Sequence, residues 1–265
     1  MRPERGRHQS TVPDTMSTLE AIAVVAVGLF AGAINTIVGS GSLVTFPTLL
    51  AIGYPPVVAN VSNTIGITFG AMSGVVGYRR ELRGQSARVL LLGSGSFIGG
   101  ITGGVLLLTL PGSVFRDVVP ALILLACLLV VIGPRLGRLV AARRRAPVEH
   151  GGAALWIGIF LTGVYGGYFG AAQGVILLAL LGIFIAEDLQ RLNAVKNTLA
   201  LIANGVAAIL FVFAADVAWE VVVLIAAGSI VGGQLGALIG RRLPVPVLRA
   251  VIVVVGLIAA IRLLT

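Results

Sequence analysis

Apolar residues along the chain form long blocks, which short polar or charged seams separate. A helix needs about 17 to 25 predominantly apolar residues to cross a hydrocarbon core of ~30 Å. Two apolar regions, 19–53 and 153–184, are longer than one crossing, and small polar residues break each of them. The other blocks predict long spans at 57–78, 87–109, 113–132, 191–213, 218–240 and 245–264. The pattern therefore predicts an all-α polytopic membrane protein.

The composition supports a lipid environment. Hydrophobic residues make up 57% of the 265 residues, charged residues make up 11%, and the mean hydropathy is +1.05. A soluble domain has roughly 45–50% apolar and about 25% charged residues. We therefore expect a multi-pass protein of the cell (inner) membrane, in contact with the lipid bilayer.

The charged residues and the single cysteine exclude several function classes. The net charge is +9, but most Lys and Arg lie in seams between spans rather than on one basic face, so no nucleic-acid partner is expected. Cys127 is the only cysteine, which excludes an intramolecular disulfide and a thiolate metal site.

The two halves of the chain repeat each other. The segment "GSFIGGITGG" (95–104) matches "GSIVGGQLGA" (228–237), and at the same offset Arg116 aligns with Arg249. Further upstream, "VSNTIG" (61–66) matches "VKNTLA" (195–200). The segment "GAINTIVGSGS" (32–42) likewise matches "GVYGGYFGAAQ" (163–173). Many secondary transporters are built from such internal repeats.

Each repeat is expected to consist of a broken, re-entrant helical hairpin followed by three long transmembrane helices. We find no A-x-A-like cleavage site after a short apolar core near the N-terminus, so the first residues are expected to be a disordered tail rather than a signal peptide. The expected organisation is a tail (1–17), repeat 1 (18–133), a basic cytoplasmic linker (134–152) and repeat 2 (153–265).

The positive-inside rule distinguishes inverted from parallel repeats. If each broken region enters and leaves on one side, the repeats are inverted, and the arginine-rich segments 79–88, 135–145 and 241–242 all lie in the cytoplasm. The acidic segment 215–220 then lies outside, as do both termini, with the arginines of the N-terminal tail. Parallel repeats would place 241–242 outside and the acidic segment inside. The charges of the internal loops favour the inverted arrangement.

The two breaks carry the candidate site. Within hydrocarbon, non-helical backbone is tolerated only where protein buries it or where it lines a wet cavity. Glycines would let the chain turn there, and the free N–H groups of the following half-helices would bind an anion at the centre. The residues concerned are Asn35, Gly39, Ser40, Gly41, Ser42, Tyr168, Gly170, Gln173 and Gly174.

Two of these interpretations have alternatives. Small residues can serve only to let helices pack closely, which is how we interpret the isolated glycines Gly99, Gly103, Gly232 and Gly236. A tyrosine such as Tyr168 is also common at a membrane interface.

The glycine pattern resembles a known family. The pattern G-x-x-x-G-x-x-x-x-x-x-G-x-G-[GS] at 28–42, followed by Pro47 and an Ala-Asn-Thr-rich span, is similar to that of the TauE/SafE sulfite exporter family of membrane permeases. The resemblance covers 19–264 and both repeats. It departs from the family where "SGS" replaces a run of three glycines and where the second repeat has "AAQG". The resemblance implies transport of a small sulfur-containing anion such as sulfite or an organosulfonate, and the departures leave the exact substrate open.

The spans that follow each break begin with polar residues. Asn193, Lys196 and Asn197 share one helix face, at spacings of three and four residues. A lysine inside an apolar span usually faces a cavity and marks a substrate or ion path, and with amide donors it would hold a sulfur oxyanion. The alternative is that Lys196 snorkels to a nearby cytoplasmic interface. The corresponding face in repeat 1 carries Asn60, Asn63 and Thr64.

No constellation of residues indicates catalysis. There is no His or carboxylate cluster with metal spacing and no nucleophile beside a base, and "GSGS" lacks the Gly-Lys-Ser/Thr of a phosphate-binding loop. We therefore expect no enzyme activity, cofactor or metal. The alternative to a permease is a channel or a non-transporting membrane assembly subunit. The direction of transport, the coupling ion and a homodimer are left open by the sequence.

Overall fold

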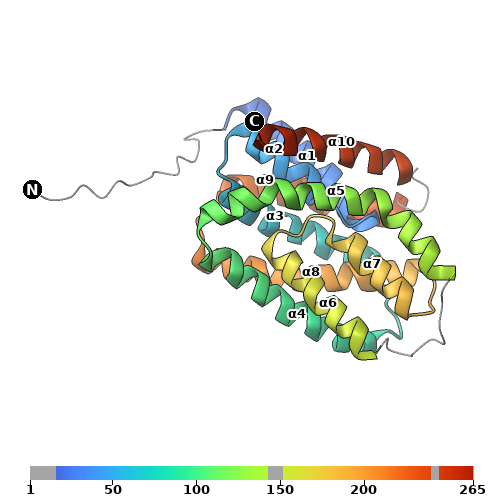
Figure 1. Cartoon of the computed structure of the whole chain (residues 1–265). Coiled ribbons are helices and arrows are strands. Elements are labelled where there is room, and N and C mark those ends of the chain that lie inside the picture. The colour runs from blue at the N-terminus through green and yellow to red at the C-terminus, as the bar shows by residue number, and fades with distance from the viewer. Residues whose placement is uncertain (1–15, 143–151, 240–244, 265) are drawn as a thin grey trace, which may run out of the picture.

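Every element in the described part of the chain is a helix (Figure 1). The computed structural model describes residues 16–142, 152–239 and 245–264. Within these residues the helices are α1 Thr18–Ile37, α2 Ser42–Ile52, α3 Pro56–Gly77, α4 Ser86–Thr109, α5 Gly112–Ala142, α6 Gly152–Tyr168, α7 Gln173–Phe184, α8 Leu189–Ala214, α9 Trp219–Ile239 and α10 Val245–Leu264. Most of the expected tail, part of the expected linker and the pair Arg241–Arg242 lie outside the described residues.

The long helices agree with the spans that hydropathy predicts. The helices α3, α4, α8, α9 and α10 each begin and end within about two residues of the expected limits. Five helices of the described chain, including α1, are long and apolar enough to cross a membrane. Large apolar side chains on their surfaces are exposed, for example Leu90 at 76% and Phe213 at 85%. Such surfaces suit lipid contact, and the prediction of a multi-pass, all-helical membrane protein is confirmed.

Helix α5 is longer than expected. The predicted span ends at 132, but the helix continues to Ala142, into the segment that we expected to be a linker. The apolar part ends at Gly133. Beyond it, "PRLGRLVAA" consists largely of Leu, Ala and Arg, which are good helix formers, so the helix continues after its apolar span ends.

Local sequence sets where several helices begin. Ser17 and Glu20 form a capping box at the start of α1, in which each side chain accepts a hydrogen bond from the other residue's backbone amide. Pro56 occupies the first turn of α3, where its missing N–H costs nothing. Asp188 caps α8, and its carboxylate accepts a 2.7 Å hydrogen bond from the backbone amide of Gln190.

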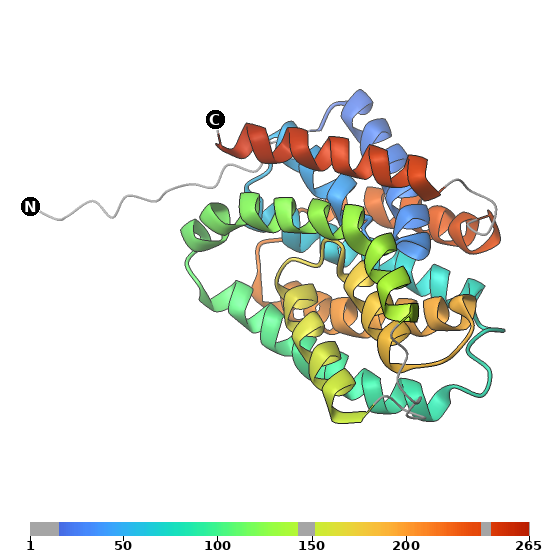
Figure 2. The same cartoon turned by 45° about the vertical axis from the view of Figure 1, so that its right-hand side comes forward.

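Each hairpin packs mainly against the other half of the chain. The first hairpin helix, α1, lies along α9, and its counterpart α6 lies along α4. Helix α2 contacts α10, and α7 contacts α5; Figure 2 shows α10 lying over α2 and beside α5. Exchanging the two halves therefore reproduces these four helix contacts.

Glycines bring the helix pairs into close contact, as we expected for the isolated glycines. A Cβ atom placed on Gly232 would lie 1.9 Å from the carbonyl oxygen of Leu29, between α9 and α1. A Cβ atom placed on Gly103 would lie 2.1 Å from the carbonyl oxygen of Val164, between α4 and α6. Any side chain at either position would separate the helices.

Helices α3 and α8 contact each other and run in opposite directions. Near the start of α3, the hydroxyl of Ser62 accepts a 2.9 Å hydrogen bond from the backbone amide of Ala218, which follows the end of α8. At the other end, the hydroxyl of Tyr78 donates to the side chain of Gln190 at the start of α8, at 3.3 Å. The start of each helix therefore lies beside the end of the other.

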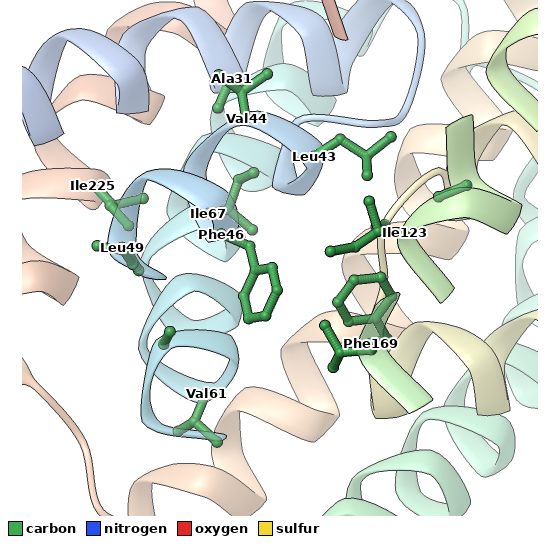
Figure 3. Packing of buried hydrophobic residues seen from close by; sticks show 14 of the residues in the cluster. Ala31, Leu43, Val44, Phe46, Leu49, Val61, Ile67, Ile123, Phe169 and Ile225 are labelled. Carbon is green, nitrogen blue, oxygen red and sulfur yellow. The ribbon is translucent and has the colours of Figure 1, made fainter. Parts of the chain in front are cut away.

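Aromatic rings fill the space between the two hairpins. Phe46 of α2 meets Phe169 of the second break edge to face, with ring centroids 5.4 Å apart (Figure 3). Phe115 of α5 contacts both rings, at 6.5 and 6.2 Å. All three side chains are buried, so the returning helix α2 and the second break share one apolar core.

Candidate functional site

The helices break at the two positions that the sequence predicts. Residues Val38–Gly41 separate α1 from α2, and residues Phe169–Ala172 separate α6 from α7. Gly39 has φ +85° and Gly170 has φ +78°. This left-handed conformation is strained for other residues, so each turn needs a glycine.

The tips of the two hairpins touch. The backbone amide of Gly174 donates a 3.0 Å hydrogen bond to the carbonyl oxygen of Gly39. A Cβ atom placed on Gly39 would lie 2.3 Å from the Cα of Gly174. The two breaks therefore converge, but one amide at the start of α7 binds the other tip and is not free for a ligand.

The start of α2 keeps free donors. The backbone hydrogen bonds among the described residues include none from the amides of Ser40, Gly41 or Ser42. The Ser40 hydroxyl is buried and has no partner in the described chain. A helix N-terminus with free amides favours negative charge.

Lys196 lies deep inside the protein at the end of α1. Its side chain is fully buried, and its Nζ donates hydrogen bonds to the carbonyl oxygens of Asn35 at 3.3 Å and Thr36 at 3.2 Å. Because the Lys196 side chain is fully buried and its ammonium group is bound to the end of α1, it does not extend to the surface, which contradicts the snorkelling alternative.

Two asparagines join the lysine at the same carbonyl. The side-chain amides of Asn193 and Asn197 donate to the carbonyl oxygen of Thr36, at 3.2 and 3.3 Å. The expected shared face of Asn193, Lys196 and Asn197 is therefore present and points at the last turn of α1. Three donors from one helix converge on one acceptor.

The lysine has no carboxylate partner in the described chain. The ion pairs found there join Glu187 to Arg88 and to Arg191, at the start of α8 and outside the candidate site. The negative end of the α1 dipole offsets only part of the charge on Lys196. A buried ion without an opposite charge is costly, because its loss of hydration is not repaid.

The corresponding face of repeat 1, on α3, carries no charged residue and contacts both hairpins through hydrogen bonds. The side-chain amide of Asn60 donates to the carbonyl oxygen of Tyr168, the last residue of α6, at 3.0 Å. Asn63 accepts a short hydrogen bond from the hydroxyl of Thr45. The Thr64 hydroxyl donates to the carbonyl of Asn60 in its own helix, so its proton is not free for a ligand.

Some predicted residues contribute in ways that the sequence did not indicate. Tyr168 offers its carbonyl to Asn60, while its ring packs on Phe115 with centroids 5.5 Å apart. Asn35 is half-buried and offers its carbonyl to Lys196. The side chain of Gln173 packs against Gly166, where an added Cβ atom would lie 2.3 Å from its Nε2.

Buried polar atoms without partners gather around the breaks and the starts of α3 and α8. Among the described residues they include Ser40 Oγ, Asn60 Oδ1, Asn63 Nδ2, Gln173 Oε1 and Nε2, Asn193 Oδ1 and Asn204 Oδ1. Buried polar atoms are usually hydrogen-bonded, so such a cluster indicates a place for water or a ligand.

Asn204 is a further polar residue of the site that the sequence analysis does not include. Its place in the middle of a span favours an interhelical hydrogen bond, but its Oδ1 has no partner in the described chain. A Cβ atom placed on Gly170 would lie 3.6 Å from this oxygen. Asn204 therefore lies beside the second break. Asn204 lies two helical turns after Asn197, so the helical period places it on the face of α8 that carries Lys196, and this spacing could have indicated its position.

Comparison with known proteins identifies relatives along nearly the whole chain. A sequence model of the family described as "Sulfite exporter TauE/SafE" matches residues 24–263. A probable membrane transporter protein of Haemophilus influenzae is 28% identical over 220 residues, which cover 83% of this chain and 85% of the relative. A probable membrane transporter protein of Sinorhizobium, ORF9, is 28% identical over 236 residues, or 88% of each chain. The probable membrane transporter protein YfcA of Escherichia coli K12 is 26% identical over 239 residues, which cover 90% and 87%. No solved structure matches significantly.

Proposed function

Because this chain belongs to the sulfite exporter TauE/SafE family and is a membrane transporter rather than an enzyme, we propose that it carries a small anion, sulfite or an organosulfonate. The proposed binding site lies where the two hairpin tips meet the starts of α3 and α8. Its cation is Lys196.

A single observation carries this proposal: Lys196 is fully buried, and no carboxylate neutralises it in the described chain. A buried charge is stable when an opposite charge accompanies it. A transported anion would supply the opposite charge that Lys196 lacks in the described chain. The bound anion would complete the charge balance of the site for part of each transport cycle.

The surrounding donors suit an oxyanion of sulfur. Sulfite and sulfonates present three oxygens, each of which accepts hydrogen bonds. The free amides at the start of α2, the Ser40 hydroxyl and the side-chain amides of Asn193 and Asn197 are donors close to the hairpin tips. Ammonium-to-oxyanion hydrogen bonds are stronger than neutral ones, so Lys196 would supply most of the affinity.

Binding of the anion would replace hydrogen bonds that these residues already make. Lys196, Asn193 and Asn197 already bind carbonyls at the end of α1. An arriving anion therefore replaces existing hydrogen bonds, and its net affinity is smaller than the sum of its new contacts. Moderate affinity suits a transporter, because the substrate must also leave.

We further propose that the two repeats are inverted. The start of α3 lies beside the end of α8, and the end of α3 lies beside the start of α8. Helices α3 and α8 are the matching helices of the two repeats. Because they run in opposite directions within one membrane, they support two repeats that are related by a rotation about an axis in the membrane plane. Parallel repeats would direct both helices the same way.

Chemical labelling tests this topology. Cys127 is the only cysteine, so a Cys127→Ser background carries no thiol. Asp216→Cys and Arg80→Cys, both at exposed positions, would then report on opposite ends of α3 and α8. A membrane-impermeant maleimide added outside whole cells should label Asp216→Cys and leave Arg80→Cys unlabelled. Equal labelling of the two would contradict the inverted arrangement.

Flux into proteoliposomes tests the transport proposal. The panel is sulfite, sulfoacetate, sulfate, phosphate and an uncharged solute of similar size. We expect saturable flux of sulfite or the sulfonate, and a loss of about tenfold or more in Lys196→Met, because a charge-assisted hydrogen bond contributes about 1.5–3 kcal/mol. Arg80→Gln removes an exposed charge and should leave flux unchanged. Uncharged solutes passing as fast as anions would refute the anion site, and flux that does not saturate would favour a channel.

A further inference from the structure

A cavity of about 640 Å³ opens at one end of the helices, apart from the proposed site. Its walls are the starts of α3 and α5 and the ends of α4 and α8. These are the helix ends that lie together because α3 and α8 run in opposite directions. No local pattern in the chain indicates this cavity, because its walls come from four separate segments.

Two charged side chains line the cavity, Arg116 in α5 and Asp216 after the end of α8. Two helix starts and two helix ends also line it, so the helix dipoles largely offset each other. The electrostatic potential therefore depends on the side chains. Neither Arg116 nor Asp216 takes part in the ion pairs found among the described residues.

An aromatic contact links the neighbour of a cavity residue to a residue of the proposed site. Phe115, next to Arg116, is buried and packs on the ring of Tyr168 with centroids 5.5 Å apart. The carbonyl of Tyr168 accepts the hydrogen bond from Asn60. On the α3 side, Val58 in the cavity wall precedes Asn60 by about half a helical turn.

We infer that this cavity is the vestibule from which the anion reaches the proposed site, and that Arg116 is the residue that captures the anion there. The inference rests on the proposed anion transport. The planar guanidinium offers paired N–H donors to two oxygens of a sulfite or sulfonate group. Its charge raises the local concentration of anions at the mouth, while the charge of Asp216 lowers it.

Opposite effects of the two charges provide the first test. In flux assays from the vestibule side at low salt, Arg116→Gln should raise the KM for sulfite about threefold to tenfold with little change in maximal rate. Asp216→Asn should lower this KM by about twofold. Asp117→Asn is the matched control, since Asp117 is an exposed neighbour that does not line the cavity, and it should leave KM unchanged. The differences should shrink at ~1 M salt, where the Debye length is about 3 Å.

Charge-selective labelling provides a second test that does not need transport. In a Cys127→Ser background, Val57→Cys places a thiol in the cavity wall. In nanodiscs, the labelling preference is the ratio of the rates for the anionic ethylsulfonate methanethiosulfonate and the cationic trimethylammonium analogue, each relative to the reaction with a free thiol. Arg116→Gln should shift this preference toward the cationic reagent by about threefold or more, and Asp216→Asn should shift it toward the anionic reagent.

The outcomes separate this inference from the proposed function. The labelling preference should persist in Lys196→Met, because the cavity and the buried site are distinct. If Arg116→Gln and Asp216→Asn both keep the wild-type KM and labelling ratio, the vestibule is refuted while the result for Lys196 stands. If Lys196→Met transports normally, the proposed site fails whatever happens at Arg116.

Discussion

The starts of α3 and α8 occupy matching positions in the two repeats but differ in one decisive side chain. "VSNTIG" has Ser62 where "VKNTLA" has Lys196. The hydroxyl of Ser62 accepts a hydrogen bond from the neighbouring amide of Ala218, whereas Lys196 reaches across to the carbonyls that end α1. Both hairpins are held by asparagines, but only one is held by a charge. At these two matching positions the described chain therefore carries one cation, Lys196, and the anion should bind beside α8 rather than on the axis midway between α3 and α8.

Removing the charge is the strongest test of this comparison. Lys196→Ser should lower sulfite flux in proteoliposomes about tenfold or more, since it removes a charge-assisted donor. The matched change Ser62→Ala should alter flux by about twofold or less, because it removes one neutral hydrogen bond. Comparable losses in both variants would mean that the two halves contribute alike.

The double variant Ser62→Lys with Lys196→Ser moves the charge from α8 to α3 and tests whether its position matters. Ser62 accepts from an amide near the start of α9, where a second donor is unfavourable. We therefore expect no recovery of flux and a lower thermal midpoint than in Lys196→Ser alone. Recovery would show that the anion binds on the axis.

Supplying an internal counter-ion should have the next largest effect. Asn197→Asp places a carboxylate beside Lys196, where it would compete with the substrate. We expect the KM for sulfite to rise about tenfold, which corresponds to about 1.4 kcal/mol of lost binding. Asn63→Asp is the matched change in repeat 1, where the preceding residue is Ser62 rather than a lysine, and it should mainly reduce stability. An unchanged KM in Asn197→Asp would contradict the role of Lys196.

Alanine substitutions at the two hairpin tips should also reduce the stability of the protein unequally. Gly39 and Gly170 have similar positive φ angles, so an alanine at either strains the backbone by roughly 1–2 kcal/mol. A Cβ on Gly39 would also overlap the Cα of Gly174 at 2.3 Å, whereas on Gly170 the nearest atom is a carbonyl oxygen at 3.0 Å. Gly39→Ala should therefore be the less stable variant by about 1–3 kcal/mol in a thermal or denaturant assay. Equal losses would show that the tips separate easily.

The smallest effect is expected at the loop before α8, which has an ionic contact that the loop before α3 lacks in the described chain. Burial raises the pKa of Glu187, but the amide of Asp188 together with Arg191 and Arg88 outweighs it and holds this pKa below its ordinary value of 4.5. Because the folded pKa is depressed, the stabilisation is present above pH 4.5 and is lost as the pH falls through the lower folded value. Glu187→Gln should remove this pH dependence and reduce stability by about 1 kcal/mol or less. A thermal midpoint that falls equally with acid in both proteins would contradict the contact.

The sequence predicted those features that depend on neighbouring residues. Hydropathy located α3, α4, α8, α9 and α10, because a span long enough for the bilayer is a local property of the chain. Gly39 and Gly170 marked the breaks because only glycine takes the required φ without strain. The helical period placed Asn193, Lys196 and Asn197 on one face.

The partners of these residues could not be predicted from the local pattern. Lys196 binds carbonyls 160 and 161 residues away, and every residue offers such a carbonyl, so composition gives no sign of it. The contact of Gly39 with Gly174 likewise arises from packing between halves. The far end of α5 was missed because its arginines suggested a loop, while its leucines and alanines continue the helix.

The packing of each hairpin against the other half of the chain has a consequence for biosynthesis. The ribosome releases α1 long before α9, the helix on which α1 comes to rest. Until the second half is made, the first hairpin lacks its partners α9 and α10 and packs mainly against α3 of its own half, so its polar turn must be sheltered by lipid headgroups, by the translocon or by a chaperone. A nascent chain halted after α5 should therefore be open to proteolysis near Ser40, and two separately expressed halves should be recovered intact only when they are made in the same cell.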